Sequence, residues 1–224
     1  MNPRHLMKLA AALFVLGALT VPARADLITN GCFGTGNLSG WTVFTTSNGT
    51  NGGPGLPRVD LFNVTGMGLS LAAGFNVGQL VFISNDEEGG GLTQMVMAPV
   101  AGLYTFSLDI SSRDDQDGQI NVAAGTFSIL IDGVTVASDD LGGFTSPGQI
   151  LRGALSGTVS LTPGSHDFEI LITRPFLSGG TDTPNEYIDN ASLLAPSVPE
   201  PGSIALLGTG LVALGYWRRR RTAA

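Results

Sequence analysis

Cysteine and histidine are nearly absent from this chain of 224 residues, which contains one cysteine and two histidines. A single thiol, Cys32, cannot form a disulfide within the chain, so the stability of the fold must come from a packed core. His5 falls in an apolar N-terminal leader, which leaves His166 for any imidazole chemistry. This shortage of ligands excludes zinc catalysis by histidine or thiolate side chains. We expect Cys32 to be buried and inert at the start of the first strand.

Basic residues are also scarce between the two ends of the chain. Residues 26–197 contain four of the 11 lysine and arginine residues and 17 of the 18 aspartate and glutamate residues, which gives this segment a net charge of −13. So acidic a surface offers no cationic sites for phosphates, which argues against nucleic-acid binding. Its carboxylates keep an exported protein soluble and could also bind a hard cation such as Ca²⁺.

Long apolar runs occur only at the two ends of the chain. At the N-terminus, Arg4 and Lys8 precede an apolar stretch, after which Ala23 and Ala25 form the small-x-small pattern of a cleavage site. This order of features predicts a secretory signal peptide over residues 1–25. The protein is therefore expected to leave the cytoplasm through the secretion machinery.

The C-terminal apolar run follows a proline-rich segment. Val198, Pro199, Glu200 and Pro201 precede an uncharged stretch over residues 202–217. As a helix, this stretch would span roughly 24 Å at 1.5 Å per residue, slightly less than a hydrocarbon core of about 30 Å. Proline cannot continue a helix, so we expect the segment before the run to be extended and accessible.

The apolar run is followed at once by four consecutive arginines, Arg218, Arg219, Arg220 and Arg221. Such a cluster stays on the cytoplasmic side, so a transmembrane helix over residues 202–217 would leave the preceding domain outside. The three parts together resemble the PEP-CTERM sorting signal of Gram-negative bacteria, a tail also labelled an ice-binding-protein C-terminal domain. The resemblance implies a sorting signal over residues 197–224, processing by a membrane-embedded exosortase, and transient anchoring in the inner membrane before delivery to the cell surface or extracellular matrix. An ordinary single-pass anchor is the alternative.

Between the two ends of the chain, apolar and polar residues alternate with a period of two. In residues 103–110, for example, Tyr104, Phe106, Leu108 and Ile110 would share one face of a strand. Further strands are expected over residues 40–44, 79–83, 92–97, 127–131, 134–137, 158–162, 166–173 and 187–194.

Turn residues separate these strands. Asp132-Gly133 is typical of a two-residue type I′ hairpin, and the glycine-rich residues 48–55 and 89–91 are expected to be loops. No helical stripe occurs between the two apolar ends. The pattern therefore predicts an all-β protein, with a single β-sandwich of the jelly-roll type over residues 26–196.

Segments at both limits of this domain resemble known jelly rolls. Residues 27–33 (LITNGCF) and 38–42 (LSGWT) are similar to the opening, and residues 187–193 (YIDNASL) to the closing strand, of galactose-binding-like and carbohydrate-binding-module domains. The resemblance implies that the two segments lie together and help to hold a structural Ca²⁺. Asp189 occupies the acidic position of the closing strand. Gly34 stands where an acidic residue is usual, so one expected ligand is missing.

A second candidate for a Ca²⁺ site is the acidic loop that contains Asp115 and Asp117. Asp115, Asp117 and Gly118 fit positions three, five and six of an EF-hand loop, but Arg113 stands at position one and no glutamate at position twelve. The loop is therefore not an EF-hand. A looser Ca²⁺ site and a solvated strand connection remain as alternatives, and no other cofactor is expected.

No catalytic arrangement stands out. Ser165, His166 and Asp167 are adjacent in sequence, but successive residues of a strand point to opposite faces, so they cannot form a triad with one another. A Gly-x-Ser-x-Gly elbow is absent. We therefore expect no enzymatic activity and a surface position for His166. A pair of carboxylates acting on glycosides is not excluded by spacing, which leaves a secreted glycoside hydrolase as a distant alternative.

Glycan binding would need exposed aromatic rings flanked by polar side chains. Phe144 and Phe176 lie in loop-like stretches near Arg152 and Arg174, so we take Phe144, Phe176 and Arg174 as candidate sugar contacts, and we expect Trp41 to belong to the core. The sequence predicts an exported, non-enzymatic protein with a structural or adhesive role. A carbohydrate-binding module that recognises an extracellular polysaccharide is the alternative.

Overall fold

The computed structural model describes residues 24–83, 85–114, 120–179, 183–197 and 208. The first 23 residues of the predicted signal peptide lie outside this part of the chain, as do the Val198–Pro201 segment and Arg218 to Arg221. No helix among the described residues is both long and apolar enough to cross a membrane. The segment from Ala25 to Pro196 forms one compact unit.

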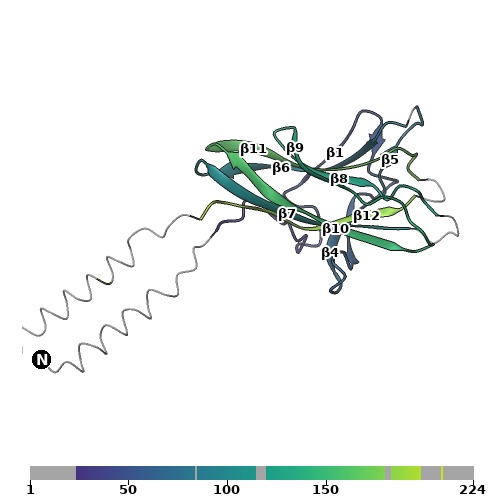
Figure 1. The fold of residues 1–224 in the computed structure, drawn as a ribbon, viewed down its shortest axis with the longest axis horizontal. Helices are drawn as coiled ribbons and strands as arrows, with labels where there is room; N and C mark the ends of the chain where they lie inside the picture. The colour runs from purple at the N-terminus through teal and green to yellow at the C-terminus, as the bar shows by residue number, and fades with distance from the viewer. Residues whose placement is uncertain (1–23, 84, 115–119, 180–182, 198–207, 209–224) are drawn as a thin grey trace, which may run out of the picture. The chain divides into compact units, whose positions relative to one another are not determined.

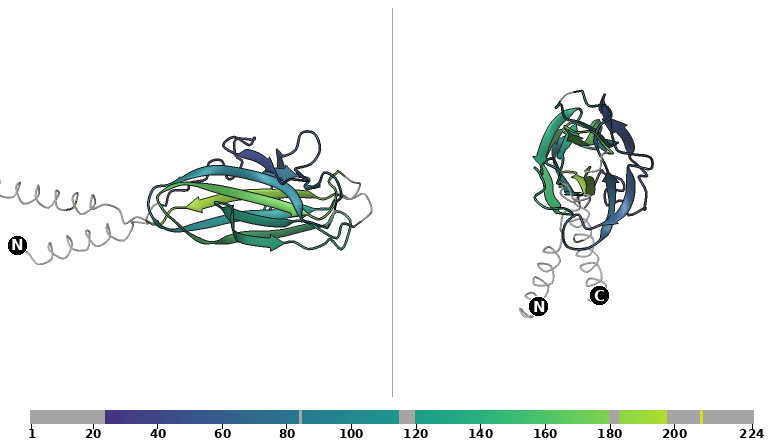
Figure 2. Two further views of the ribbon diagram at one scale, coloured as in Figure 1. Left: turned by 90° about the horizontal axis from the view of Figure 1, so that it is seen from above. Right: turned by 90° about the vertical axis from the view of Figure 1, so that its right-hand side faces the viewer.

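This unit is an all-β sandwich, as the sequence predicts (Figures 1 and 2). Its first sheet has the strand order β1-β6-β11-β8-β9 and its second sheet the order β10-β7-β12-β4-β3, while β2 and β5 form a short ribbon. All paired strands are antiparallel. The strands are β1 (Thr42–Thr45), β2 (Gly49–Thr50), β3 (Arg58–Phe62), β4 (Ser70–Phe75), β5 (Gly78–Gln79), β6 (Glu88–Ala98), β7 (Gly102–Arg113), β8 (Thr126–Ile131), β9 (Val134–Asp140), β10 (Ile150–Leu161), β11 (Gly164–Arg174) and β12 (Asn185–Leu194).

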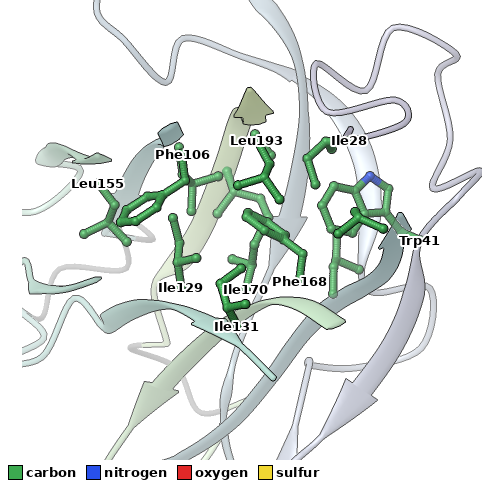
Figure 3. Close-up of a cluster of buried hydrophobic side chains, with 14 of the residues drawn as sticks. Ile28, Trp41, Phe106, Ile129, Ile131, Leu155, Phe168, Ile170 and Leu193 are labelled. Carbon is green, nitrogen blue, oxygen red and sulfur yellow. The ribbon is translucent and has the colours of Figure 1, made fainter. Parts of the chain in front are cut away.

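The core lies between the two sheets and follows the predicted alternation (Figure 3). On β7, the inward residues from Tyr104 to Ile110 are almost fully buried, whereas Leu103 on the other face is exposed. Trp41 belongs to the core, as expected. Its ring lies 6.3 Å from that of Phe168, and its indole nitrogen donates a hydrogen bond to the carbonyl oxygen of Asn30. Each large apolar side chain buried here contributes about 1.5–3 kcal/mol to stability.

The opening and closing segments of the domain lie together, as the jelly-roll resemblance implies. Asp26 forms a bridge with Leu194, and one of its carboxylate oxygens accepts a hydrogen bond from the Leu193 amide at 2.9 Å. The opening segment consists mainly of turns, because the first strand begins only at Thr42. The prediction for Cys32 is therefore wrong: the residue lies in a turn, where its side chain is exposed.

Apart from residues 63–69, which join β3 and β4, the short turns and the long connections between strands lie at opposite ends of the sandwich. At the end where the chain enters and leaves, which we call the terminal end, residues 99–101, 132–133 and 162–163 connect strands tightly. Asp132 and Gly133 both have positive φ, which fits the predicted type I′ turn. At the opposite end, which we call the loop end, the connections are longer and lie at residues 46–57, 76–87, 114–125, 141–149 and 175–184.

Two predictions about glycine and apolar residues are wrong. Residues 89–91 form part of β6 instead of a loop, and there the glycines allow close packing of neighbouring backbones. A Cβ atom on Gly91 would lie 1.8 Å from the carbonyl oxygen of Ile170. The expected strand over residues 79–83 ends at Gln79, and the four apolar residues that follow are exposed. The strands β3 and β4 were not predicted, because their small and polar residues hide the alternation.

Candidate functional site

His166 ties two turns of the terminal end together. It lies on β11, as predicted, but its side chain is mostly buried and not on the surface. The Nδ1 atom lies 2.7 Å from a carboxylate oxygen of Asp132, and Nε2 lies 2.9 Å from the carbonyl oxygen of Thr162. The hydrogen bond to Asp132 raises the pKa of His166. Ser165 and Asp167 are on the other face of the strand, so the three neighbours form no triad.

Arg174 is buried and cannot contact a ligand in solvent, so its expected role as a surface sugar contact is wrong. Its side chain is 1% exposed and donates hydrogen bonds to the carbonyl oxygens of Ala123 and Val77, at 3.0 and 3.2 Å. The Nε atom lies 3.9 Å from a carboxylate oxygen of Glu186. Burial raises the pKa of Glu186 to about 8 and lowers that of Arg174. Through its hydrogen bonds to Ala123 and Val77, Arg174 links two connections of the loop end from inside.

The predicted aromatic sugar contacts are not exposed rings. Phe144 is 5% exposed, because the loop that carries it folds back and its amide binds the carbonyl oxygen of Asn121 at 2.9 Å. Phe176 is half-buried. Among the aromatic residues that the structure describes, only Phe82 is exposed. A sugar ring could therefore stack fully on one side chain, which sequence reasoning placed in a strand.

Of the predicted Ca²⁺ ligands, Asp115 and Asp117 lie outside the described residues. Asp189 is buried, and its carboxylate accepts hydrogen bonds from the Ser70 hydroxyl and the Asn190 amide, both at 2.7 Å. Burial raises the pKa of this carboxyl. Within the described part of the chain, no three histidine, cysteine or acidic side chains are grouped so that they could hold a metal ion.

The feature that sequence reasoning missed is an exposed apolar segment at the loop end. It consists of four consecutive residues, each between 53% and 73% exposed, and we call it the apolar loop: Leu80, Val81, Phe82 and Ile83. Leu177, which follows the strand β11, is also exposed and is bridged to Gln79 at the base of the loop. Exposed apolar residues that gather in this way often mark an interaction site.

Hydrogen bonds hold the backbone of the apolar loop in one conformation. The Asn48 carbonyl accepts from the Leu80 amide, while the Asn48 side chain both accepts from and donates to the backbone of Val81. The buried Gln79 side chain accepts from the Ile83 amide at 3.2 Å and donates to the carbonyl oxygens of Asp86 and Pro175. The polar groups face inward and the apolar side chains face solvent, so the loop is organised for contact before any partner arrives.

The chain after this loop is acidic. Asp86 and Glu87 are exposed and Glu88 is half-buried at the start of β6. Arg174, at the end of β11, is buried and presents no positive charge at the surface. The apolar loop therefore carries a negative flank.

The C-terminal segment matches a known family model. Residues 197–221 match the PEP-CTERM protein-sorting motif, which confirms the resemblance of the tail. The chain is thus an exported, surface-directed protein. No curated protein matches the chain.

Several solved structures are similar in fold. TmCBM61, determined in complex with beta-1,4-galactotriose, is 15% identical over 77% of this chain and 99% of its own, with a TM-score of 0.45. A Stig cyclase, Fisc, from Fischerella sp. TAU is 14% identical over 79% of this chain and 100% of its own, with a TM-score of 0.46. A family 35 carbohydrate binding module from Clostridium thermocellum is 13% identical over 77% and 95%, with a TM-score of 0.31. At these TM-scores the likeness carries no functional argument.

Proposed function

We propose that this protein is a non-enzymatic adhesive or structural module of the cell surface or extracellular matrix. The observation that carries the proposal is the apolar loop, four exposed apolar side chains on a hydrogen-bonded backbone at the loop end. Keeping such side chains in water has no value for the fold itself, so a contact with another surface accounts for them best.

The route to that surface follows from the sorting motif. The secretion machinery would export the chain, the apolar run of the tail would hold the precursor in the inner membrane, and an exosortase would recognise and process the segment at Val198 to Pro201. The compact unit ends at Pro196, directly before the matched motif. Both chain connections leave from the terminal end, so the loop end is free of covalent links.

A retention experiment in the native host tests the adhesive role. The variant with Val81→Ser and Phe82→Ser should still be exported and processed, but should move from the cell-surface or matrix fraction into the medium. A matched control carries Val100→Ser and Val134→Ser, which removes two exposed apolar side chains from the terminal end. Equal retention of the two variants would refute a contact role for the apolar loop.

Carbohydrate binding is the second candidate, and Phe82 is the observation in its favour. This ring is exposed, and the polar Asn48 side chain is bonded to the residue before it. A single ring on a backbone held in this way could stack on one sugar. Binding to a glycan microarray that disappears in Phe82→Ala, but not in Val134→Ala, would support this candidate. Absence of binding by the unsubstituted protein would eliminate it for the glycans on the array.

A further inference from the structure

A second exposed apolar patch lies on the hairpin that joins β3 and β4. Leu61 is 66% exposed, Met67 94% and Leu69 72%. We call these three residues the hairpin patch. Below them, Phe62 stacks on Tyr187 with a centroid distance of 3.7 Å, so the hairpin is anchored to the outer face of the second sheet.

Positive charge gathers around this patch. The Arg113 guanidinium lies 5.7 Å from the centroid of the Phe62 ring, and Arg152 donates hydrogen bonds to the carbonyl oxygen of Asn63. Arg58 lies on β3 itself, where it pairs with Asp60. Arg58 and Asp60 offset each other's charge, so Arg113 and Arg152 supply the positive charge beside the hairpin. The hairpin patch has a positive flank, whereas the apolar loop has a negative one.

The two apolar patches cannot meet within one molecule. The apolar loop follows β5, which contacts β6 and β11 of the first sheet, whereas the hairpin lies against the outer face of the second sheet (Figure 1). A second copy of the chain, however, offers each patch a surface of matching polarity and opposite charge. Such complementarity favours encounter and selects the register of a contact.

We propose that the apolar loop of one molecule docks on the hairpin patch of a second molecule. The inference rests on the proposed adhesive role of the apolar loop and names its partner. Because the two patches differ, the contact is head-to-tail, and each docked molecule leaves one patch free for a further copy. The result is an open chain or a ring of domains, and not a two-fold dimer. Such growth suits a structural component of a cell surface.

The contact should be weak between isolated molecules. Each patch contains only a few side chains, so the area that the contact buries should be well below the roughly 800 Å² per partner of a stable interface. Display of many copies on one surface would strengthen it by raising the effective concentration. High salt should weaken it, because the charged flanks lie in solvent.

Complementation between two variants tests the proposal on the exported protein purified from its host. A loop variant carries Val81→Ser and Phe82→Ser, and a hairpin variant carries Met67→Ser and Leu69→Ser. All four side chains are exposed, so melting temperature should be unchanged, which circular dichroism checks. In sedimentation velocity, the mean mass of the unsubstituted protein should rise with concentration. Each variant alone should remain a monomer, whereas an equal mixture should form one-to-one dimers and nothing larger.

Other outcomes would overturn the proposal. If the hairpin variant alone dimerises, the apolar loop pairs with itself. If the unsubstituted protein stays monomeric at every concentration but sediments with phosphatidylcholine vesicles, the loop binds lipid. A third outcome is that the protein stays monomeric and binds no vesicles, while its retention on the cell surface still requires Val81 and Phe82. The partner would then be a different molecule, and the proposed function would remain intact.

Discussion

The two ends of the sandwich differ in what their residues do. At the terminal end, three turns of two or three residues are tied by side-chain contacts such as the one from His166 to Asp132. At the loop end, the buried Arg174 is hydrogen-bonded to two long connections, and one of them exposes apolar side chains. The comparison shows that the terminal end closes the fold where the chain enters and leaves it, whereas the loop end presents exposed side chains. The predictions below test this difference, starting from the largest expected effect.

Removal of the buried arginine should unfold the loop end. Arg174→Met leaves the carbonyl oxygens of Ala123 and Val77 without their donor. We expect a loss of about 1–3 kcal/mol in the free energy of unfolding for each carbonyl oxygen left unpaired, measured by urea denaturation. The control is Glu186→Gln, which keeps an acceptor for the Val77 amide and should change stability little at neutral pH, because burial keeps Glu186 protonated there. A total loss below about 1 kcal/mol would show that Arg174 does not support this end.

Stability should fall as pH rises, with a separate contribution from each end. At the loop end, Glu186 has a folded-state pKa of about 8, above its unfolded value, so its stabilising effect is complete below the unfolded value and is lost as pH rises through 8. The pKa of His166 is also raised, so the terminal end loses stability as pH rises past the ordinary histidine range. Each group contributes at most about 1.4 kcal/mol per pH unit.

Single substitutions separate the two contributions to this pH dependence. Glu186→Gln should flatten the profile of unfolding free energy between about pH 5 and 8, while His166→Gln should flatten only the region near and above pH 6.5. Thermal melts in a series of buffers would measure both. Profiles that stay parallel to that of the unsubstituted protein would mean that neither group is the source.

The Asp132-Gly133 turn at the terminal end should tolerate substitution less well than its exposure suggests. Gly133 has φ of +75°, so Gly133→Ala is strained in the type I′ turn and should cost about 1 kcal/mol. By contrast, Gly53→Ala at the loop end has no positive φ to maintain and open space at its Cβ, and should be neutral. Differential scanning calorimetry of the two variants distinguishes these outcomes, and equal melting temperatures would contradict the first.

Loss of the Gln79 side chain, which holds the backbone of the apolar loop, should make this loop more mobile with little effect elsewhere. Gln79→Ala removes the acceptor of the Ile83 amide and the donors to Asp86 and Pro175. Amide exchange should accelerate in residues 80–83 and stay unchanged in β7. If exchange in this segment were already fast in the unsubstituted protein, the loop would not be organised before binding.

Local patterns predicted the scaffold well. The alternation from Tyr104 to Ile110 and the Asp132-Gly133 turn depend on neighbouring residues, and both are confirmed. The sorting signal could also be recognised from the sequence, because its residues are contiguous. Predicting these features does not require knowing which residues pack against them from the other sheet.

The candidate site was harder to predict, because exposure depends on distant residues. The apolar residues after Gln79 look like a buried strand until Asn48 is known to hold them outward. Arg174 looks like a surface cation until Glu186, on another strand, is found beside it. Glycine occurs both in loops and where two backbones pack closely, and Gly91 is of the second kind.

Footprinting on intact cells tests most directly whether the loop end is the contact surface. In a Cys32→Ser background, cysteine would be placed beside the apolar loop by Asn85→Cys and at the terminal end by Val134→Cys, both at exposed positions. Maleimide labelling on the host surface is compared with labelling of the purified monomer. We predict strong protection at position 85 and little at position 134. Equal labelling of both positions on cells and in solution would contradict the account.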